Sequence, residues 1–169
     1  MMMTPREAEA LSVVHLRIVT VLDEVRVGVP PDRDAAFDHL RRLLAAAMAA
    51  ERLWQQPGSV LVHQRGRAPN HAAIAASVAY LEQAHRDSLD FVIEAALLEE
   101  IVTEHMAPGR GRWERAAGLV QRVATRLPAD GRVTFQQLRG MADGMVRGSS
   151  GRPFFTARRA ARAPEPRTR

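Results

Sequence analysis

The sequence contains no cysteine and no lysine, and only 5% of its 169 residues are aromatic. Without cysteine, neither a disulfide nor a cysteine-ligated metal can form. Because so few aromatic side chains are present, alanine and leucine must fill most of the core, which favours packed helices over a β-sandwich. No stretch reaches the roughly 20 apolar residues of a membrane span, and the opening residues lack the pattern of a secretory signal. We therefore expect a cytoplasmic protein without a membrane partner.

Charge is distributed unevenly along the chain, whose formal net charge is +5. Residues 1–105 hold 10 arginines and 15 acids, whereas residues 106–169 hold 14 arginines and 4 acids. The first part therefore carries −5 and the second +10, which predicts a polyanionic partner for the basic part. Two compatible explanations account for the absence of lysine: the codon usage of a GC-rich genome, and the ability of arginine to bind phosphate through two parallel hydrogen bonds, which lysine does not form.

Apolar residues recur at helical spacing in five segments, which predicts helices at about 5–27, 32–55, 71–106, 112–127 and 135–147. The first begins at a capping box opened by Thr4, and the last at a second box, Thr134 to Gln137, before ending at Gly148. Residues 71–106 contain no glycine or proline. A cap at Asp87 or Ser88 would divide them into two helices, but we favour one long helix.

These segments predict an all-α protein, a helical bundle of about five helices. We assign the bundle to residues 1–147, with an acidic part at 1–106 and a basic part at 107–147. Residues 148–169 form a basic C-terminal tail, which we expect to be flexible when the protein is alone.

The helix predicted at 112–127 carries a row of arginines that we call the arginine ridge: Arg112, Arg115, Arg122 and Arg126. At 100° per residue they fall within an arc of about 80°. The neighbouring side of the same helix is predicted to be buried through its apolar residues Trp113, Ala116, Val120, Val123, Ala124 and Leu127. Few acids are interspersed, so the ridge repels itself unless an anion lies against it. Arginines one helical turn apart suit successive phosphates, which position a protein without reading sequence. The same role is predicted for Arg132, Arg139, Arg147, Arg152, Arg158 and Arg159. An ordinary solvated face and a protein or membrane surface are the alternatives.

A second, smaller anion site is predicted at Arg65, Arg67, Asn70 and His71, beside the N-terminus of the helix that starts at His71. The spacing of Arg65 and His71 also resembles the arginine–histidine signature of certain helical-bundle ribonucleases, whose pair acts on the RNA 2′-hydroxyl and phosphate. A small ribonuclease using these two residues is therefore an alternative function. A structural or assembly protein with a basic docking tail is another.

No catalytic residue, cofactor or metal site is predicted. Glu82 and His85 match one half of a di-iron carboxylate motif, but such a site requires the Glu-x-x-His pattern twice and the sequence contains it once.

In its length, its cysteine-free helical pattern and its arginine ridge, the chain resembles the small α-helical subunits of CRISPR-associated effector complexes, which serve in antiviral defence. The resemblance implies a non-catalytic subunit of a ribonucleoprotein complex that lies against RNA, an RNA–DNA hybrid or single-stranded DNA without cleaving it. It also implies other protein subunits as partners and association between copies of the chain. No residue role is carried over from that family.

Overall fold

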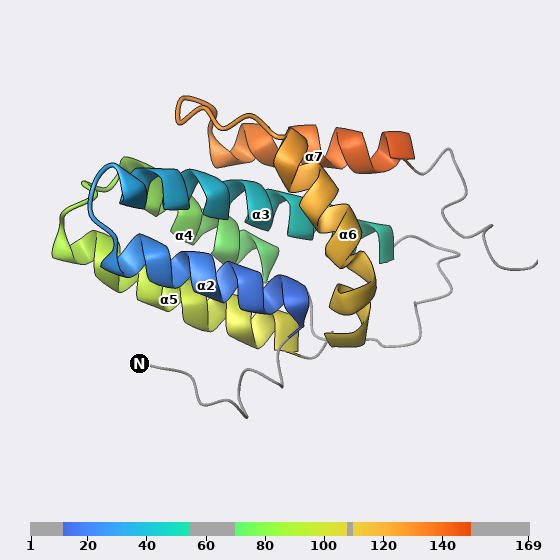
Figure 1. Ribbon diagram of the computed structural model, residues 1–169, viewed down its shortest axis with the longest axis horizontal. Coiled ribbons are helices and arrows are strands. Elements are labelled where there is room, and N and C mark those ends of the chain that lie inside the picture. Colours follow the sequence, from blue (N-terminus) through green and yellow to red (C-terminus); the bar gives the residue numbers. More distant parts are fainter. Residues whose placement is uncertain (1–11, 55–69, 108–109, 150–169) are drawn as a thin grey trace, which may run out of the picture.

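The computed structural model describes residues 12–54, 70–107 and 110–149, which form six α-helices and no strand (Figure 1). The helices are α2 (Val13–Val27), α3 (Asp32–Trp54), α4 (His71–Gln83), α5 (Leu89–Met106), α6 (Arg110–Arg126) and α7 (Phe135–Ser149). The predicted all-α bundle is confirmed, with six helices instead of five. None of these six combines the length and the apolar character that crossing a bilayer requires.

Helix α3 occupies the centre of the bundle, in contact with α2, α6 and α7 (Figure 1). Every residue from Leu43 to Ala50 is buried. A helix that is apolar on all sides needs neighbours on all sides, and five alanines in this stretch let those neighbours approach closely. Helices α2, α4 and α5 lie alongside α3, while α6 crosses one end of the group and α7 lies along its edge (Figure 1).

The first described helix starts later than the sequence predicted. Ser12 has an extended backbone, and its hydroxyl accepts a hydrogen bond from the backbone N–H of His15 at 3.1 Å. Because Ser12 is the N-cap, one continuous helix over 5–27 is wrong, and the capping box at Thr4 lies outside the described residues. At the other end, a Cβ on Gly28 would lie 2.5 Å from the carbonyl oxygen of Glu24, so only glycine fits there.

The long helix predicted for residues 71–106 is also wrong, since α4 and α5 are separate. Ser88 caps α5 and accepts a hydrogen bond from the backbone N–H of Phe91 at 3.2 Å. Arg86 donates to the carbonyl oxygen of Leu81 near the end of α4. The Arg86 guanidinium lies 4.2 Å from the Phe37 ring centroid and 5.1 Å from that of Phe91. The break therefore depends on packing against α3 as well as on the cap.

The last helix confirms its predicted start and extends past its predicted end. The backbone N–H of Gln137 donates to the Thr134 hydroxyl at 3.3 Å, and the Gln137 amide oxygen accepts from the Thr134 N–H at 2.8 Å. This is the predicted capping box. Helix α7 continues through Gly148, so the boundary of the C-terminal tail at 148 is placed slightly too early. On α7, Met141 is exposed and Val146 is buried.

Candidate nucleic-acid interface

Helix α6 packs on α2 and α3 through the apolar flank that the sequence predicted. All six residues of that flank are buried: Trp113, Ala116, Val120, Val123, Ala124 and Leu127. They recur at intervals of three and four residues, which places them on one side of the helix. The rotation of α6 about its axis is therefore fixed, and the arc on the opposite side faces solvent.

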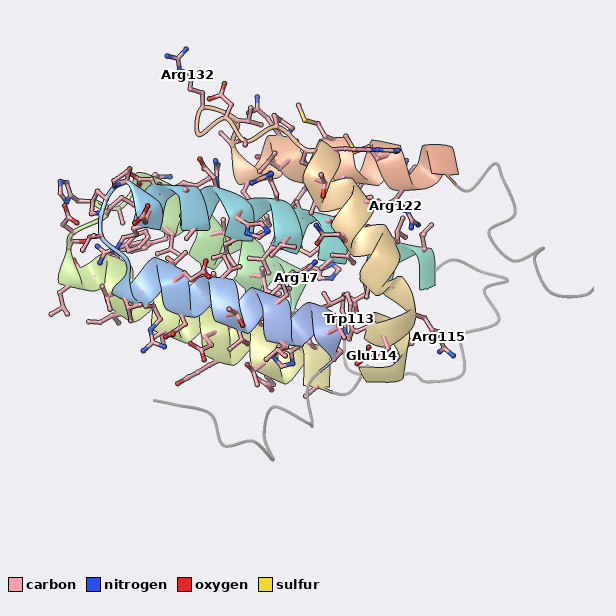
Figure 2. All side chains as sticks on the ribbon, viewed as in Figure 1. Arg17, Trp113, Glu114, Arg115, Arg122 and Arg132 are labelled. Atoms are coloured by element: carbon pink, nitrogen blue, oxygen red, sulfur yellow. The ribbon has the colours of Figure 1, made fainter. Side chains whose placement is uncertain are left out.

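The arginine ridge lies on or beside this solvent-facing arc. Arg115, Arg122 and Arg126 are exposed, while Arg112, next to the buried flank, is half-buried. Figure 2 shows Arg115 and Arg122 on the side of α6 that faces away from Arg17 of α2. Arg115 and Arg126 are eleven residues apart, so they differ by about 20° around the helix and about 16 Å along it. At 3.4 Å per phosphate in one strand, that length corresponds to about five phosphates.

Ion pairs in the described residues neutralise other arginines. They are Arg26–Glu99 at 2.8 Å, Arg33–Asp87 at 3.2 Å, Arg41 with Asp38 and Glu82 at 2.6 Å each, Arg86–Asp34 at 3.2 Å, and Arg52–Asp143. No carboxylate in the described part of the chain pairs with Arg115, Arg126, Arg132 or Arg147. Arg112 and Arg122 have interactions with other groups of the chain. We therefore assign the unneutralised positive charge to Arg115, Arg126, Arg132 and Arg147.

The remaining predicted contact residues are distributed over several surfaces. Arg132 is exposed on the turn before α7 (Figure 2), and Arg147 is exposed near the end of α7. Arg139 is half-buried and lines a cavity of about 350 Å³ between α4 and α7. Burial and the neighbouring charge of Arg52 lower the pKa of Arg139, and the charge of Asp143 raises it. Its contact with nucleic acid stays a prediction. Arg152, Arg158 and Arg159 lie outside the described residues.

Sequence reasoning missed a second group of basic side chains, which we call the α2–α3 basic patch: Arg17, His39 and Arg42. Burial lowers the pKa of His39, and the charges of Arg42 and Arg17 lower it further. Arg17 also donates a hydrogen bond to the amide oxygen of Gln121 on α6. The patch therefore lies next to the side of α6 that carries Gln121 and that faces away from the arginine ridge. His39 and Arg42 are three residues apart on α3 and so are neighbours on its surface, but Arg17 of α2 joins them only when α2 and α3 pack together.

The predicted anion site around His71 is not supported by its surroundings. The His71 Nε2 lies 2.7 Å from Glu51 Oε2, and the His105 Nε2 lies 2.8 Å from the same oxygen. Burial raises the pKa of Glu51, but hydrogen bonds from His105 and His71 outweigh it and lower the pKa to about 2. An ionised carboxylate beside His71 repels anions, so we withdraw His71 from the anion site.

The other members of that predicted site add little to it. The backbone N–H of Asn70 points at the His105 Nδ1, 3.4 Å away, instead of toward a free anion position. Arg65 and Arg67 lie outside the described residues, and with them the arginine of the ribonuclease alternative. The residues that surround His71 are instead Glu51 and His105, which the sequence did not bring together because they lie 20 and 34 positions away.

Comparison with known proteins yields no match to a family model, a curated protein or a solved structure. The interface is therefore interpreted from the chemistry of its own residues.

Proposed function

We propose that this protein is a non-catalytic subunit that lies along a nucleic-acid backbone through the exposed side of α6. One observation carries the proposal. Arg115 and Arg126 stand in line on a helix whose orientation is fixed by its buried flank, and neither has a carboxylate partner in the described residues. A row of unneutralised guanidinium groups is favourable only when anions lie against it.

The chemistry of these side chains favours phosphate as the anion. A guanidinium group presents two parallel N–H donors that match two phosphate oxygens. Contacts of this kind fix a strand in place without distinguishing bases. The ligand is therefore RNA, an RNA–DNA hybrid or single-stranded DNA of any sequence. The resemblance to small subunits of CRISPR-associated complexes adds the proposal that other protein subunits present this strand.

The test is a salt titration of binding, followed by fluorescence anisotropy with labelled oligonucleotides of each type and of unrelated sequences. The logarithm of the binding constant should fall linearly with the logarithm of salt concentration between about 50 and 200 mM. The double variant R115Q/R126Q removes two phosphate contacts, so the slope should decrease in magnitude by about 1.4 to 1.8. The loss of affinity should be similar for every sequence.

A matched control removes the same charge from another part of the surface. Arg26 and Arg33 pair with Glu99 and Asp87, at the end of α2 remote from α6. The variant R26Q/R33Q should therefore leave the slope unchanged, provided that both doubles remain folded by circular dichroism. Equal effects of the two doubles would contradict the assignment to α6. Salt-independent binding would contradict phosphate contact altogether, and RNA cleavage by the purified protein would contradict a non-catalytic role.

A further inference from the structure

Three helix ends meet at a group of side chains that the proposed function does not use, the Glu51–His71–His105 cluster. Glu51 lies in the last turn of α3, His71 is the first residue of α4, and His105 lies in the last turn of α5. Their side chains are 17%, 13% and 8% exposed, respectively. One potential ligand atom from each lies within 4.8 Å of the other two. The fold thus brings two imidazoles and a carboxylate to one partly buried point.

We propose that this cluster binds one divalent transition-metal ion of the zinc class. Two histidine nitrogens and one glutamate oxygen form a ligand set that Zn²⁺ accepts, with a fourth position left for water. Calcium and magnesium are disfavoured, because they require several oxygen ligands and the cluster supplies a single carboxylate. Imidazole is a ligand that zinc and its neighbours in the first transition row prefer.

The geometry needs only a small adjustment to accept such an ion. Zinc–ligand distances of about 2.0 to 2.2 Å place two ligands of a tetrahedral site about 3.3 Å apart. The Glu51 Oε2 now lies 2.7 Å from the His71 Nε2 and 2.8 Å from the His105 Nε2. These two separations must therefore open by about 0.5 Å. The third separation, between the two imidazole nitrogens, lies within the 4.8 Å that encloses all three ligand atoms.

The surroundings also favour a cation at this position. Helices α3 and α5 both end here, and the C-terminal end of a helix carries partial negative charge. The N-terminal end of α4 at His71 carries partial positive charge and opposes this effect, but two C-terminal ends contribute more than one N-terminal end. Trp113 of α6 packs against the His105 ring with centroids 6.4 Å apart, which helps to hold that imidazole. Glu51 is ionised at neutral pH, because its pKa is lowered to about 2.

Binding requires a rearrangement of protons. A histidine that binds a metal through Nε2 must present the lone pair there, so each Nε2 proton now directed at Glu51 shifts to Nδ1 or leaves. At His105 this change gives up the long contact between Nδ1 and the Asn70 N–H, 3.4 Å apart. Protons and metal therefore compete for the two imidazoles.

The experiment is a titration of the chelator-treated full-length protein with Zn²⁺ by isothermal calorimetry. We expect one Zn²⁺ per chain. Substitution of Co²⁺ should give the intense visible absorption of a four-coordinate ion. Free Zn²⁺ at 100 times the dissociation constant should raise Tm by about 5 to 10 °C. None of these measurements involves nucleic acid, so their result is independent of the proposed function.

Four variants decide whether the cluster is the site. E51Q, H71N and H105N should each abolish the stoichiometric binding and the Co²⁺ spectrum. H85N is the control, since His85 is exposed between α4 and α5, where its Nδ1 accepts the Asp87 N–H at 3.3 Å. E51Q keeps an oxygen that accepts the imidazole N–H bonds, so it remains informative where a histidine variant fails to fold. Absence of Zn²⁺ binding by the wild-type protein, its persistence in E51Q, or its loss in H85N would overturn the proposal.

Discussion

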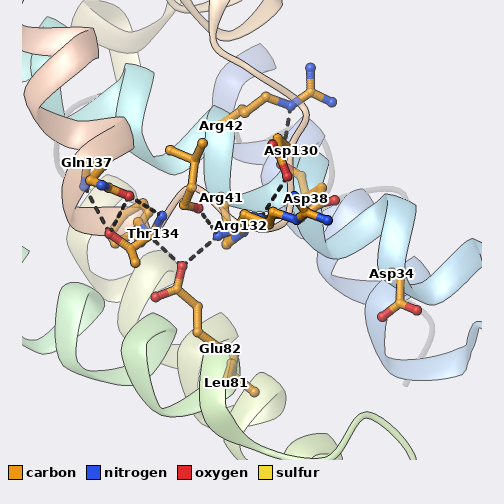
Figure 3. Close-up of polar contacts among 12 residues, drawn as sticks. Asp34, Asp38, Arg41, Arg42, Leu81, Glu82, Asp130, Arg132, Thr134 and Gln137 are labelled. Carbon is orange, nitrogen blue, oxygen red and sulfur yellow. Dashed lines mark hydrogen bonds and ion pairs between the residues drawn. The ribbon is translucent and has the colours of Figure 1, made fainter.

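Replacement of Arg41 by methionine should destabilise the protein strongly. Its side chain, on α3, is only 3% exposed and lies between two carboxylates (Figure 3). Nη1 donates to Glu82 Oε1 on α4 and to the carbonyl oxygen of Val133, at 2.6 Å each. Nη2 donates to Asp38 Oδ1, also at 2.6 Å. One guanidinium group thus joins α3, α4 and the turn that leads into α7.

The expected magnitude follows from what methionine leaves behind. Removing one partner of a buried ion pair costs about 3 to 5 kcal/mol, because the remaining charge stays in a poorly solvated place. Here Asp38 and Glu82 are 25% and 19% exposed, so water compensates in part. The N–H of Phe135 also continues to donate to Glu82 Oε1, at 2.7 Å. We therefore expect a loss near the lower limit, about 3 kcal/mol, or about 6 to 12 °C in Tm.

Urea unfolding followed by circular dichroism measures this loss. The neighbouring substitution Arg42→Met is the control. Within the described part of the chain, the Arg42 guanidinium makes one long hydrogen bond, from Nε to the carbonyl oxygen of Asp38 at 3.3 Å. We expect that control to cost less than about 1 kcal/mol. If R41M costs no more than R42M, the three-way contact does not hold the turn against α3 and α4, and the reasoning above is wrong.

Two further predictions concern pH and helix propensity. His15 is 1% exposed, and burial lowers its pKa from 6.5 to about 4. The unfolded chain binds this proton first, so stability should fall as pH drops from about 6.5 to 4, by up to about 3 kcal/mol. Urea unfolding at pH 7 and pH 4.5 should show that the free energy of unfolding falls less in H15Q than in the wild-type protein. An equal fall in both proteins would show that His15 does not cause the pH dependence. An added Cβ at Gly140 or Gly144 meets no atom within 4 Å, so each change to alanine should raise the unfolding free energy by about 0.5 to 1 kcal/mol. Thermal melts that show no increase would contradict a regular α7.

Local pattern was sufficient wherever one face of a helix had to be buried. The six apolar positions predicted for α6 are all buried, since a period of 3.6 residues leaves a single way to turn the helix toward the core. The capping box at Thr134 was equally readable, because both of its hydrogen bonds join residues three apart. The ends of helices were predicted less accurately where the sequence permits helix on both sides of the boundary, as at Gly148.

Features that depend on distant partners were beyond the sequence. Residues 84–88 contain no glycine or proline. The sequence offered Ser88 as a cap, but it did not decide between a break and one long helix. That choice also depends on Arg86, whose guanidinium lies against the ring of Phe37 almost 50 positions earlier. The Glu51–His71–His105 cluster arises in the same way, because its members come from the ends of three helices. No spacing along the chain marks residues that only tertiary packing brings together.

The ion pairs named above mostly join groups within the same part of the chain. Acids of the first part, such as Asp34, Asp38, Glu82, Asp87 and Glu99, pair with arginines of that same part. Arg52 pairs with Asp143, so one of the few acids of the basic part neutralises an arginine that lies outside it. That pair increases the positive excess around α6 and α7. Asp143 is thus used by an arginine of the first part, while Arg115 and Arg126 have no carboxylate partner in the described residues. This distribution of pairs supports the proposal that an external polyanion neutralises the α6 surface.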